Sequence, residues 1–283
     1  MPIILDNVSY TYDRDSGYGR QALKDINLVI NKGEFIGLIG HTGSGKSTLT
    51  QLLNGLLQAD GGNVYFDGQD IYEKGYDLKK LRSRVGLVFQ YPEHQLFEST
   101  VFKDVCFGPK NMGLTKKEYE LRAFKALEQV GIPPECYYSS PLELSGGQKR
   151  RVAIAGILAM EPEYLVLDEP AAGLDPAGRD EILGLINDMH KKRGMTVILV
   201  SHNMEDVALY ADRILVMNEG EIVFDDTPTH IFTRGSELEA MGLMAPQVTY
   251  LMKELRQMGF AVNTEVITKE DCVNSILRAL KRY

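Results

Sequence analysis

The stretch Gly40-His41-Thr42-Gly43-Ser44-Gly45-Lys46-Ser47 fits the pattern G-x-x-x-x-G-K-[ST] of a phosphate-binding loop. It follows the apolar run Phe35–Ile39, which predicts a buried strand, and precedes Thr48–Leu57, which favours a helix. The glycines let successive backbone N–H groups point at phosphates, and the helix N-terminus adds about half a positive charge. By chance the pattern would occur in only about one or two chains in a hundred of this length. The sequence therefore predicts a nucleotide site here.

Lys46 and Ser47 carry the chemistry of this loop. In this pattern the lysine reaches the β- and γ-phosphates, and the hydroxyl ligates Mg²⁺. The remaining residues would bind the phosphates, largely through backbone amides; they are Gly40, His41, Thr42, Gly43, Ser44, Gly45 and Thr48. We therefore expect a nucleotide and Mg²⁺ to bind at this loop.

A second apolar run, Tyr164–Leu167, ends in two carboxylates, Asp168 and Glu169. The strand would place Asp168 beside the phosphate loop, where it can hold the Mg²⁺ shell. Because side chains alternate along a strand, Glu169 points elsewhere and is the better candidate to polarise an attacking water. Two acids at a strand end are usually a solvated turn, but together with the loop they favour a catalytic role.

Short β-rich runs alternate with longer helical patterns along the chain, which is typical of an α/β domain with a largely parallel sheet. Val85–Phe89 and Thr196–Val200 predict two further buried strands. Asn63–Asp67 and Glu221–Phe224 lie beside glycine turns, so we expect them as antiparallel additions to a mixed sheet.

Residues 91–159, approximately, are mostly helical in pattern, so we expect a helical subdomain inserted between two strands of the sheet. A second boundary near residues 233–236 separates residues 1–234 from residues 235–283. In the last segment, Pro246–Met258 and Lys269–Leu280 show helical spacing around a short run, Phe260–Ile267, which predicts a small α+β segment. About fifty residues is marginal for an independent fold, so this segment should dock on something.

The composition fits a large globular domain with a small appendage. The 283 residues are 44% hydrophobic, and 31 Lys and Arg against 39 Asp and Glu give a net charge of −8. Nucleic acid binding needs surplus basic residues, so we expect no nucleic acid partner. The longest apolar stretch, Val152–Met160, is shorter than the roughly 20 residues of a crossing helix, and Met1–Tyr10 shows no signal peptide pattern. We expect Cys106, Cys136 and Cys272 to be reduced thiols of a cytosolic protein.

The stretch Leu144-Ser145-Gly146-Gly147-Gln148 puts a serine and two glycines at the start of another predicted helix. This is a second potential anion site, because helix N-termini attract negative charge. The alternative is an ordinary helix cap, since serine is a good N-cap residue. The stretch lies about 20 residues before the acidic strand, in the same chain as the phosphate loop.

Together these motifs resemble the ATP-binding subunits of ABC transporters, over roughly residues 3–232. Gln90 resembles the Q-loop glutamine of that family, Ala172–Asp175 its D-loop and His202 its switch histidine. Tyr12 matches the aromatic residue that stacks on adenine, although a tyrosine on an edge strand is the alternative interpretation.

The resemblance implies the fold of the P-loop ABC ATPases and two ATP molecules sandwiched between two subunits. Ser145, Gly146, Gly147 and Gln148 of one subunit would face the phosphate loop of the other. The implied roles are phosphate binding for Lys46, Mg²⁺ binding for Ser47, Gln90 and Asp168, activation of water for Glu169, contact with the γ-phosphate for His202 and nucleotide contact for Asp175.

Further runs resemble one branch of that family, the energy-coupling-factor ATPases; they are Phe89–Phe97, Phe107–Leu114, Arg151–Gly156 and Leu255–Gly259. The stretch Gly40–Gly43 is similar to the same stretch in the second of the two paired ATPases of this branch. The resemblance implies a second ATPase, a transmembrane T subunit and a substrate-capturing S subunit as partners. It also implies vitamins or transition-metal ions as cargo, a peripheral location on the cytoplasmic face of the cell membrane, and a pairing role for the C-terminal segment.

Some alternatives stay open. Leu96 and Phe97 would line a groove for the T subunit or pack in the core. The chain could instead serve a homodimeric cobalt/nickel-type importer or another ABC importer. A non-transport ABC protein of DNA maintenance or translation usually has a long coiled coil or two cassettes, and neither pattern occurs in the sequence. A pure ADP/ATP sensor is disfavoured by Glu169.

Overall fold

Two β-sheets form the centre of the computed structural model, which describes residues 2–14 and 17–280. Among these residues the larger sheet has six strands, in the spatial order β10 (Glu221–Asp226), β9 (Arg213–Asn218), β3 (Phe35–Gly40), β8 (Thr196–Val200), β7 (Tyr164–Asp168) and β6 (Val85–Val88). Neighbouring strands are parallel except β10, which is antiparallel to β9. The four predicted buried strands and the antiparallel addition at 221–224 are confirmed.

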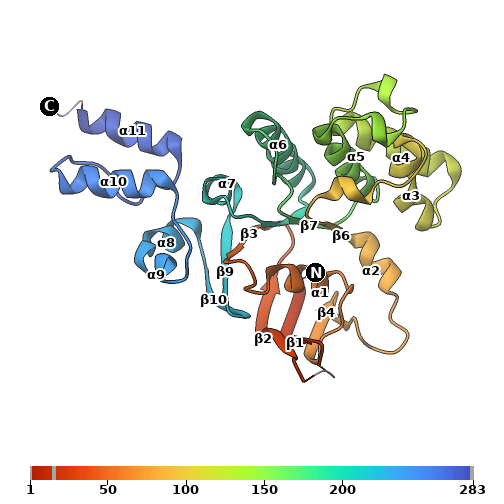
Figure 1. Cartoon of the computed structure of the whole chain (residues 1–283), viewed down its shortest axis with the longest axis horizontal. Helices are drawn as coiled ribbons and strands as arrows, with labels where there is room; N and C mark the ends of the chain where they lie inside the picture. The colour runs from red at the N-terminus through yellow and green to blue at the C-terminus, as the bar shows by residue number, and fades with distance from the viewer. Residues whose placement is uncertain (1, 15–16, 281–283) are drawn as a thin grey trace.

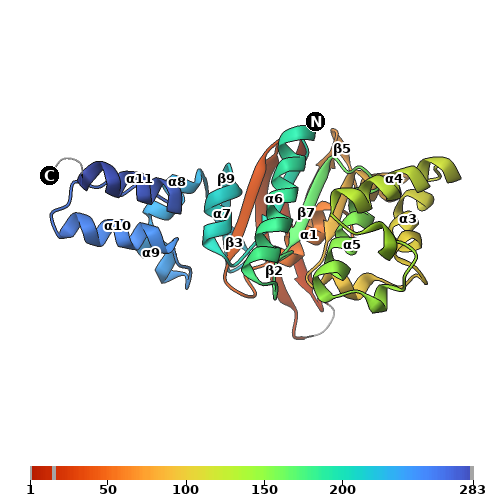
Figure 2. The ribbon, with the colours of Figure 1, turned by 90° about the horizontal axis from the view of Figure 1, so that it is seen from above.

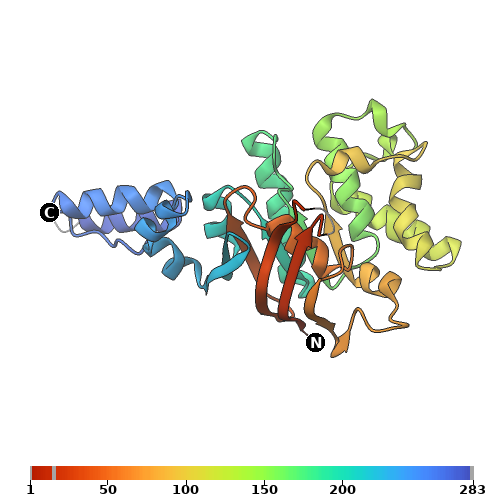
Figure 3. The same ribbon diagram turned by 60° about the horizontal axis from the view of Figure 1, so that its bottom comes forward.

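The smaller sheet is antiparallel and lies beside the first (Figures 1 and 3). Its order among the described residues is β2 (Arg20–Ile30), β1 (Ile3–Tyr12), β4 (Gly61–Phe66) and β5 (Gln69–Asp70). The run predicted at 63–67 is β4, which is antiparallel as expected but belongs to this second sheet and not to the larger mixed sheet. Although β1 lies between β2 and β4, its pairing with β4 ends at Ser9, so Tyr12 pairs with Arg20 of β2 on one side only, as the edge-strand alternative expects.

The larger sheet is covered on both faces, and β7 shows how its sequence achieves this. Leu165 and Leu167 pack with the helices α5 (Gly146–Leu158) and α6 (Pro176–Arg193). Tyr164 and Val166 pack on the opposite face, with α1 (Lys46–Leu53) and the antiparallel sheet. Side chains alternate along a strand, so a strand buried on both faces is apolar throughout. Figure 2 shows α6 lying along the strands of this sheet.

The predicted helical subdomain is confirmed between β6 and β7, and lies at one end of the molecule (Figure 1). Its elements are η1 (Pro92–Gln95), α3 (Val101–Asn111), α4 (Lys116–Gln129), η2 (Pro134–Cys136), η3 (Pro141–Glu143) and α5. A further helix, α2 (Leu78–Arg84), leads into β6. Capping boxes begin both α4, with Thr115 and Glu118, and α5, with Ser145 and Gln148.

A separate apolar cluster joins β9 to the helices that follow β8 and β10. These are α7 (Met204–Tyr210), α8 (Pro228–Thr233) and α9 (Gly235–Ala240). The cluster includes Val207, Phe232 and Leu238 and continues to Ala245. Its members therefore lie on both sides of residue 234.

The last two helices, α10 (Gln247–Gln257) and α11 (Lys269–Leu280), lie at the end of the molecule opposite the helical subdomain (Figure 1). The predicted α+β character of this segment is wrong, because described residues 235–280 form helices and irregular connections but no strand. Side chains of the two helices hydrogen-bond to backbone groups of the run Phe260–Ile267 in place of a neighbouring strand. Thr249 Oγ1 donates to the carbonyl oxygen of Val266 (3.4 Å), and Ser275 Oγ accepts from Asn263 N–H (2.9 Å). None of the described helices is long and apolar enough to cross a membrane.

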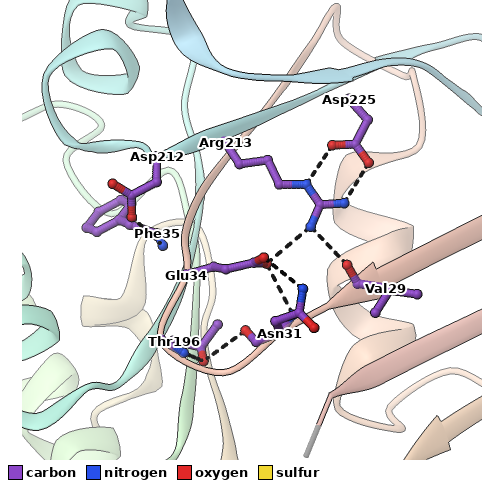
Figure 4. Close-up of polar contacts among 9 residues, drawn as sticks. Val29, Asn31, Glu34, Phe35, Thr196, Asp212, Arg213 and Asp225 are labelled. Atoms are coloured by element: carbon purple, nitrogen blue, oxygen red, sulfur yellow. Dashed lines mark hydrogen bonds and ion pairs between the residues drawn. The ribbon is translucent and has the colours of Figure 1, made fainter.

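An arginine network fixes the beginning of β3 (Figure 4). Arg213 of β9 donates to both carboxylate oxygens of Asp225 in β10 (2.6 Å each) and to the carbonyl oxygen of Val29 in β2 (2.9 Å). It also donates to Glu34 (3.1 Å), which directly precedes β3. The network joins the two sheets at one end of β3, and the phosphate loop begins at the other end.

Candidate functional site

The phosphate-binding loop connects β3 to α1 as predicted, and two of its glycines are required by close contacts. A Cβ atom on Gly40 would lie 2.4 Å from the carbonyl oxygen of Met217 in β9. Gly45 has a φ of +106°, and a Cβ atom there would lie 2.5 Å from the carbonyl oxygen of Ala22 in β2. Both positions therefore exclude a side chain, and the loop is held closely between the two sheets.

The turn between β9 and β10 also holds the loop, a contact that the sequence analysis missed. The N–H of Gly220 donates to the carbonyl oxygen of Ser44 (3.0 Å). The sequence showed Gly220 only as part of a hairpin turn. The signal that could have identified the contact is the parallel pairing of β9 with β3, which brings the ends of both strands to one edge of the sheet.

Lys46 and Asp168 carry opposite charges in a dry environment beside the loop. The Lys46 ammonium donates to the carbonyl oxygens of Gly40 (2.7 Å) and His41 (2.9 Å). Burial lowers the pKa of Lys46, although Glu169 and Asp168 act in the opposite direction. Burial likewise raises the pKa of Asp168 and outweighs its hydrogen bond with the Ser47 hydroxyl. Each charge is thus poorly solvated, which favours binding of an opposite charge.

The Ser47–Asp168 contact bears on the predicted metal site. It joins the loop to the end of β7 and brings a hydroxyl and a carboxylate together. Hydroxyl, carboxylate and amide oxygens are the ligands that Mg²⁺ prefers in proteins. The oxygens of Ser47 and Asp168 therefore fit Mg²⁺, and the side-chain carbonyl oxygen of Gln90 is of the same ligand type, but the structure gives the Gln90 side chain a contact with Glu169 instead.

Glu169 is held by two other predicted residues. Its Oε1 lies 2.6 Å from His202 Nε2, and its Oε2 accepts from Gln90 Nε2 (3.0 Å). These partners follow β8 and β6, the strands on either side of β7. Each carboxylate oxygen keeps a second lone pair, so the group can still accept a proton from water. Gln90, Glu169 and His202 are therefore one cluster, and Asp168 faces the loop instead.

Tyr12 lines a cavity of about 180 Å³ beside the loop. Its hydroxyl lies 3.1 Å from Thr48 Oγ1, and 38% of the residue is exposed. Arg20, opposite Tyr12 in the β1–β2 register, lines the same cavity and donates to the carbonyl oxygen of Gly43 (3.4 Å). Sequence analysis missed Arg20, because it belongs to no motif.

Ser145, Gly146, Gly147 and Gln148 are not brought to the phosphate loop of their own chain. Ser145 is the N-cap of α5, with Gln148 N–H donating to its Oγ (3.3 Å) and its own N–H donating to Gln148 Oε1 (3.0 Å). Ser145 and Gly146 are exposed, and a Cβ on Gly146 or Gly147 would meet open space. Across the described residues, no hydrogen bond joins this stretch to residues 40–47. The helix-cap interpretation is therefore confirmed, and the stretch is also free to meet another molecule.

Asp175 has a similar position at the start of α6. Its Oδ1 accepts from Gly178 N–H (3.1 Å), and the residue is exposed. Within the loop, His41 Nδ1 lies 2.8 Å from the carbonyl oxygen of Thr42. The predicted residues thus form one cluster around the loop and Glu169, with an exposed second group on α5 and α6.

A groove of about 610 Å³ lies between α2 and the helical subdomain, and its lining includes Leu96, Phe97, Phe107 and Ile157. Phe97 is 64% exposed and its ring packs edge-on against Phe107, with centroids 4.9 Å apart. Leu96 is partly buried against the main core. Both residues therefore line the groove, and they differ in burial: Leu96 also packs against the core, whereas Phe97 is largely exposed.

Comparison with known proteins agrees with this geometry. The profile of the family described as "ABC transporter" matches residues 23–172, and one described as "AAA domain, putative AbiEii toxin, Type IV TA system" matches residues 139–206. The chain is 55% identical over 281 residues to the energy-coupling factor transporter ATP-binding protein EcfA2 of Caldanaerobacter subterraneus subsp. tengcongensis, covering 99% of this chain and 98% of the relative.

Two solved structures are similar over most of the chain. One is cbiO1 from Clostridium perfringens, part of the ABC transporter complex cbiONQ, with a TM-score of 0.74 and 40% identity, covering 89% of this chain and 98% of that chain. The other is the dimeric, post-hydrolysis ATP-binding cassette MJ0796 bound to ADP and Pi, with a TM-score of 0.73 and 30% identity, covering 80% of this chain and 98% of that chain.

Proposed function

Since this chain belongs to the energy-coupling-factor ATPases of the ABC transporter family, we propose that it pairs with a second ATPase and powers a membrane complex for the uptake of vitamins or transition-metal ions. The chain itself is an ATP-binding and hydrolysing subunit of such a transporter. The observation that carries the pairing is the separation of two half-sites: the loop and Glu169 in one place, Ser145 and its glycines in another.

ATP binds with its phosphates on the loop and its adenine beside Tyr12. Lys46 neutralises phosphate charge, and the N-terminus of α1 adds its dipole. Ser47, Asp168 and the side-chain carbonyl oxygen of Gln90 would hold Mg²⁺, which would supply charge neutralisation for the phosphate oxygens. The buried, poorly solvated charges of Lys46 and Asp168 support this assignment.

Glu169 activates the attacking water. Its carboxylate accepts a proton from water as the water oxygen attacks the γ-phosphorus, and the bond from that phosphorus to the β–γ bridging oxygen breaks, so that ADP leaves with the electron pair. His202 and Gln90 each hold one carboxylate oxygen, so the group is oriented before reaction and little reorganisation remains. His202 also reaches the γ-phosphate in this assignment.

The partner ATPase completes the site. A triphosphate carries about four negative charges, which Lys46, Mg²⁺ and one helix dipole leave partly uncompensated. The exposed start of α5 supplies further donors, Ser145 and the amides of Gly146 and Gly147, to the γ-phosphate in the facing subunit. ATP therefore holds the two ATPases together, and hydrolysis releases them.

The groove beside η1 receives a helix of the T subunit, through which an S subunit is coupled. Its exposed aromatic residues, Phe97 and Phe107, support a partner site, because large exposed apolar patches are uncommon on monomers. The chain is then peripheral, on the cytoplasmic face of the membrane.

Affinity purification from membranes tests the proposal. The tagged chain should recover a second, similar ATPase and integral membrane subunits, and Phe97→Asp should lose the membrane subunits while keeping ATP binding and its unfolding temperature. Leu121→Asp is the matched control, because Leu121 is 52% exposed on α4 outside the groove. Recovery of this chain as the only ATPase would support the homodimeric alternative, and recovery of only ribosomes or DNA would refute transport.

A further inference from the structure

Arg150, in the second turn of α5, is a buried cation that makes three hydrogen bonds to two partners, Glu93 and Ala172. Its side chain is only 4% exposed, although it follows directly on the polar start of the helix. The guanidinium donates to both carboxylate oxygens of Glu93, from Nε (3.1 Å) and Nη2 (2.9 Å). Its Nη1 donates to the carbonyl oxygen of Ala172. The planar fork therefore fixes three segments in one geometry.

The three segments belong to different parts of the proposed machinery. Glu93 lies in η1, three residues after Gln90 and two residues before the first of the groove residues Gln95, Leu96 and Phe97. Arg150 lies on α5, whose start is Ser145 and whose later turns, from Val152 onward, also line the groove.

Ala172 belongs to the turn that holds Glu169. The N–H of Ala172 donates to the carbonyl oxygen of Glu169 (3.1 Å), and Arg150 holds the carbonyl oxygen of Ala172. A displacement of η1 or α5 would therefore be transmitted to this turn through the guanidinium. The Ala172 turn then sets the position of the Glu169 carboxylate.

The pairing of Arg150 with Glu93 is charge-assisted. Burial acts most strongly and raises the pKa of Glu93, but the hydrogen bonds and charge of Arg150, a backbone hydrogen bond and the nearby His94 together outweigh it and keep the pKa below its ordinary value. The carboxylate is thus ionised at neutral pH. Removing one partner alone would leave an uncompensated buried charge, so single variants report on folding as well as on position.

We propose that Arg150 is a positioning residue that ties the groove to the hydrolytic site, so that what occupies the groove sets the alignment of Glu169. This rests on the proposed function, in which a membrane subunit fills the groove. Arg150 itself touches neither nucleotide nor partner in this assignment; it acts through Glu93 and the Ala172 turn.

The neighbouring residue provides a matched control. Arg151 is also on α5 and pairs with Glu181 of α6 (3.0 Å), but that pair is exposed, with 64% of the Glu181 side chain accessible. Arg151→Gln with Glu181→Gln removes an arginine–glutamate pair without touching η1 or the Ala172 turn. The test variant is Arg150→Gln with Glu93→Gln, which leaves no buried charge and keeps groups that can hydrogen-bond.

Both double variants should be purified as the assembled transporter and as the paired ATPases alone, with kcat and KM for ATP measured in each. For the Arg150/Glu93 variant we expect kcat of the paired ATPases to fall about tenfold, since small misplacement of a catalytic group is costly. KM should stay within about twofold, and the stimulation of hydrolysis by the membrane subunits should be lost. Arg150→Lys keeps the positive charge but not the forked guanidinium, so this variant should retain only part of the stimulation seen in the wild type.

Two results would overturn the inference. One is a kcat and a stimulation within about twofold of wild type, because the tether would then be dispensable. The other is an equal loss of ATP binding, assembly and unfolding temperature, because Arg150 would then serve the fold alone. If the wild-type chain forms no membrane complex, the proposed function fails, and the kcat of the ATPases alone still decides the role of Arg150.

Discussion

At the scale of single residues, Glu169 has an unusual backbone. Strand β7 ends at Asp168, and Glu169 has a φ of +51°, in the left-handed region that favours glycine. Its N–H donates to the carbonyl oxygen of Val200 (3.0 Å), so the conformation is held by β8. The turn directs the carboxylate to Gln90 and His202. A residue in this conformation costs free energy, and such strain is concentrated at functional sites.

The first prediction concerns the Glu169 carboxylate. Glu169→Gln keeps the size of the side chain and one acceptor oxygen but removes the base, so ATP hydrolysis should fall at least about 100-fold. Nucleotide affinity should stay near that of the wild type. Phosphate release and equilibrium ATP binding measure the two effects.

Glu161 offers a matched control at the other end of the same strand. It also has a positive φ, +55°, but it pairs with Arg122 at the surface (3.1 Å). Glu161→Gln should hydrolyse ATP normally. Near-normal turnover in Glu169→Gln would exclude Glu169 as the base.

The second prediction concerns Asp168 and pH. Because burial raises its pKa, the folded state favours the protonated carboxyl. The associated stability is present below the pKa of the unfolded chain and is lost as pH rises through the higher pKa of the folded chain. In the absence of nucleotide, Asp168→Asn should therefore unfold at a higher temperature than the wild type at pH 7, and the difference should vanish towards about pH 3.

Calorimetry across this pH range measures the effect. Added Mg²⁺-ATP should reverse the order, because the wild type keeps the Asp168 carboxylate for Mg²⁺ and therefore gains more free energy of ligand binding than the variant. An Asn variant that is less stable than the wild type at every pH would show that the Ser47 contact outweighs burial.

The candidate site was predictable where a residue belongs to a contiguous motif. Gly40–Ser47, Asp168 and Glu169 could be found because strand, loop and helix follow each other in the sequence. The contacts of Arg150 and Gly220 could not be predicted, because their partners are distant along the chain and are brought close only by the fold.

At the scale of elements, α4 and α5 begin with the same device. Thr115 with Glu118, and Ser145 with Gln148, form capping boxes at the starts of two helices of the helical subdomain. A cap satisfies N–H groups that have no partner within the helix. The starts of the two helices differ: only α5 has glycines beside the cap, with Gly146 exposed and Gly147 half-buried.

The third prediction separates capping from phosphate binding. Ser145→Ala and Thr115→Ala should each cost about 1 kcal/mol of stability, as cap removal commonly does. Only Ser145→Ala should lower hydrolysis by the paired ATPases, because Thr115 faces no phosphate. Denaturant unfolding and steady-state hydrolysis measure the two quantities. Equal rates of hydrolysis in both variants would show that Ser145 acts only as a helix cap.

The elements were predictable where burial left a continuous apolar run. Strands β3, β6, β7 and β8 are buried on both faces and are visible in the sequence for that reason. Residues 3–12 and 20–30 mix polar and apolar side chains, so the long strands β1 and β2 were not predicted. The run Phe260–Ile267 was read as a strand-like segment, but no neighbouring strand pairs with it among the described residues.

At the scale of the whole molecule, the C-terminal helices present an apolar surface away from the ATPase core. On α11, Val273, Leu277 and Leu280 are each at least 50% exposed, at the spacing of one helix face. Met258, at the end of α10, is 73% exposed. The opposite sides of these helices form a small cluster of their own, with Met252 and Cys272. Such a surface supports the proposed pairing role.

The fourth prediction tests this face. Leu277→Asp should weaken pairing with the second ATPase at least about tenfold, because a charge would have to be desolvated in an apolar contact. ATP binding by the separate subunit should not change. Analytical ultracentrifugation of the mixed ATPases measures the pairing, with Leu121→Asp as control. Unchanged pairing would show that this face serves another contact.

The position of Ser145, remote from the loop of its own chain, has a genetic consequence. In the proposed pair, each ATP site is built from the products of two genes. Each gene product contributes its phosphate loop to one site and its Ser145 region, or the equivalent of that region, to the other. A lesion in Lys46 and a lesion in Ser145 of this chain would therefore damage different nucleotides. In a homodimer, mixing the two mutant chains would restore one intact site, whereas in a heterodimer no such complementation is expected.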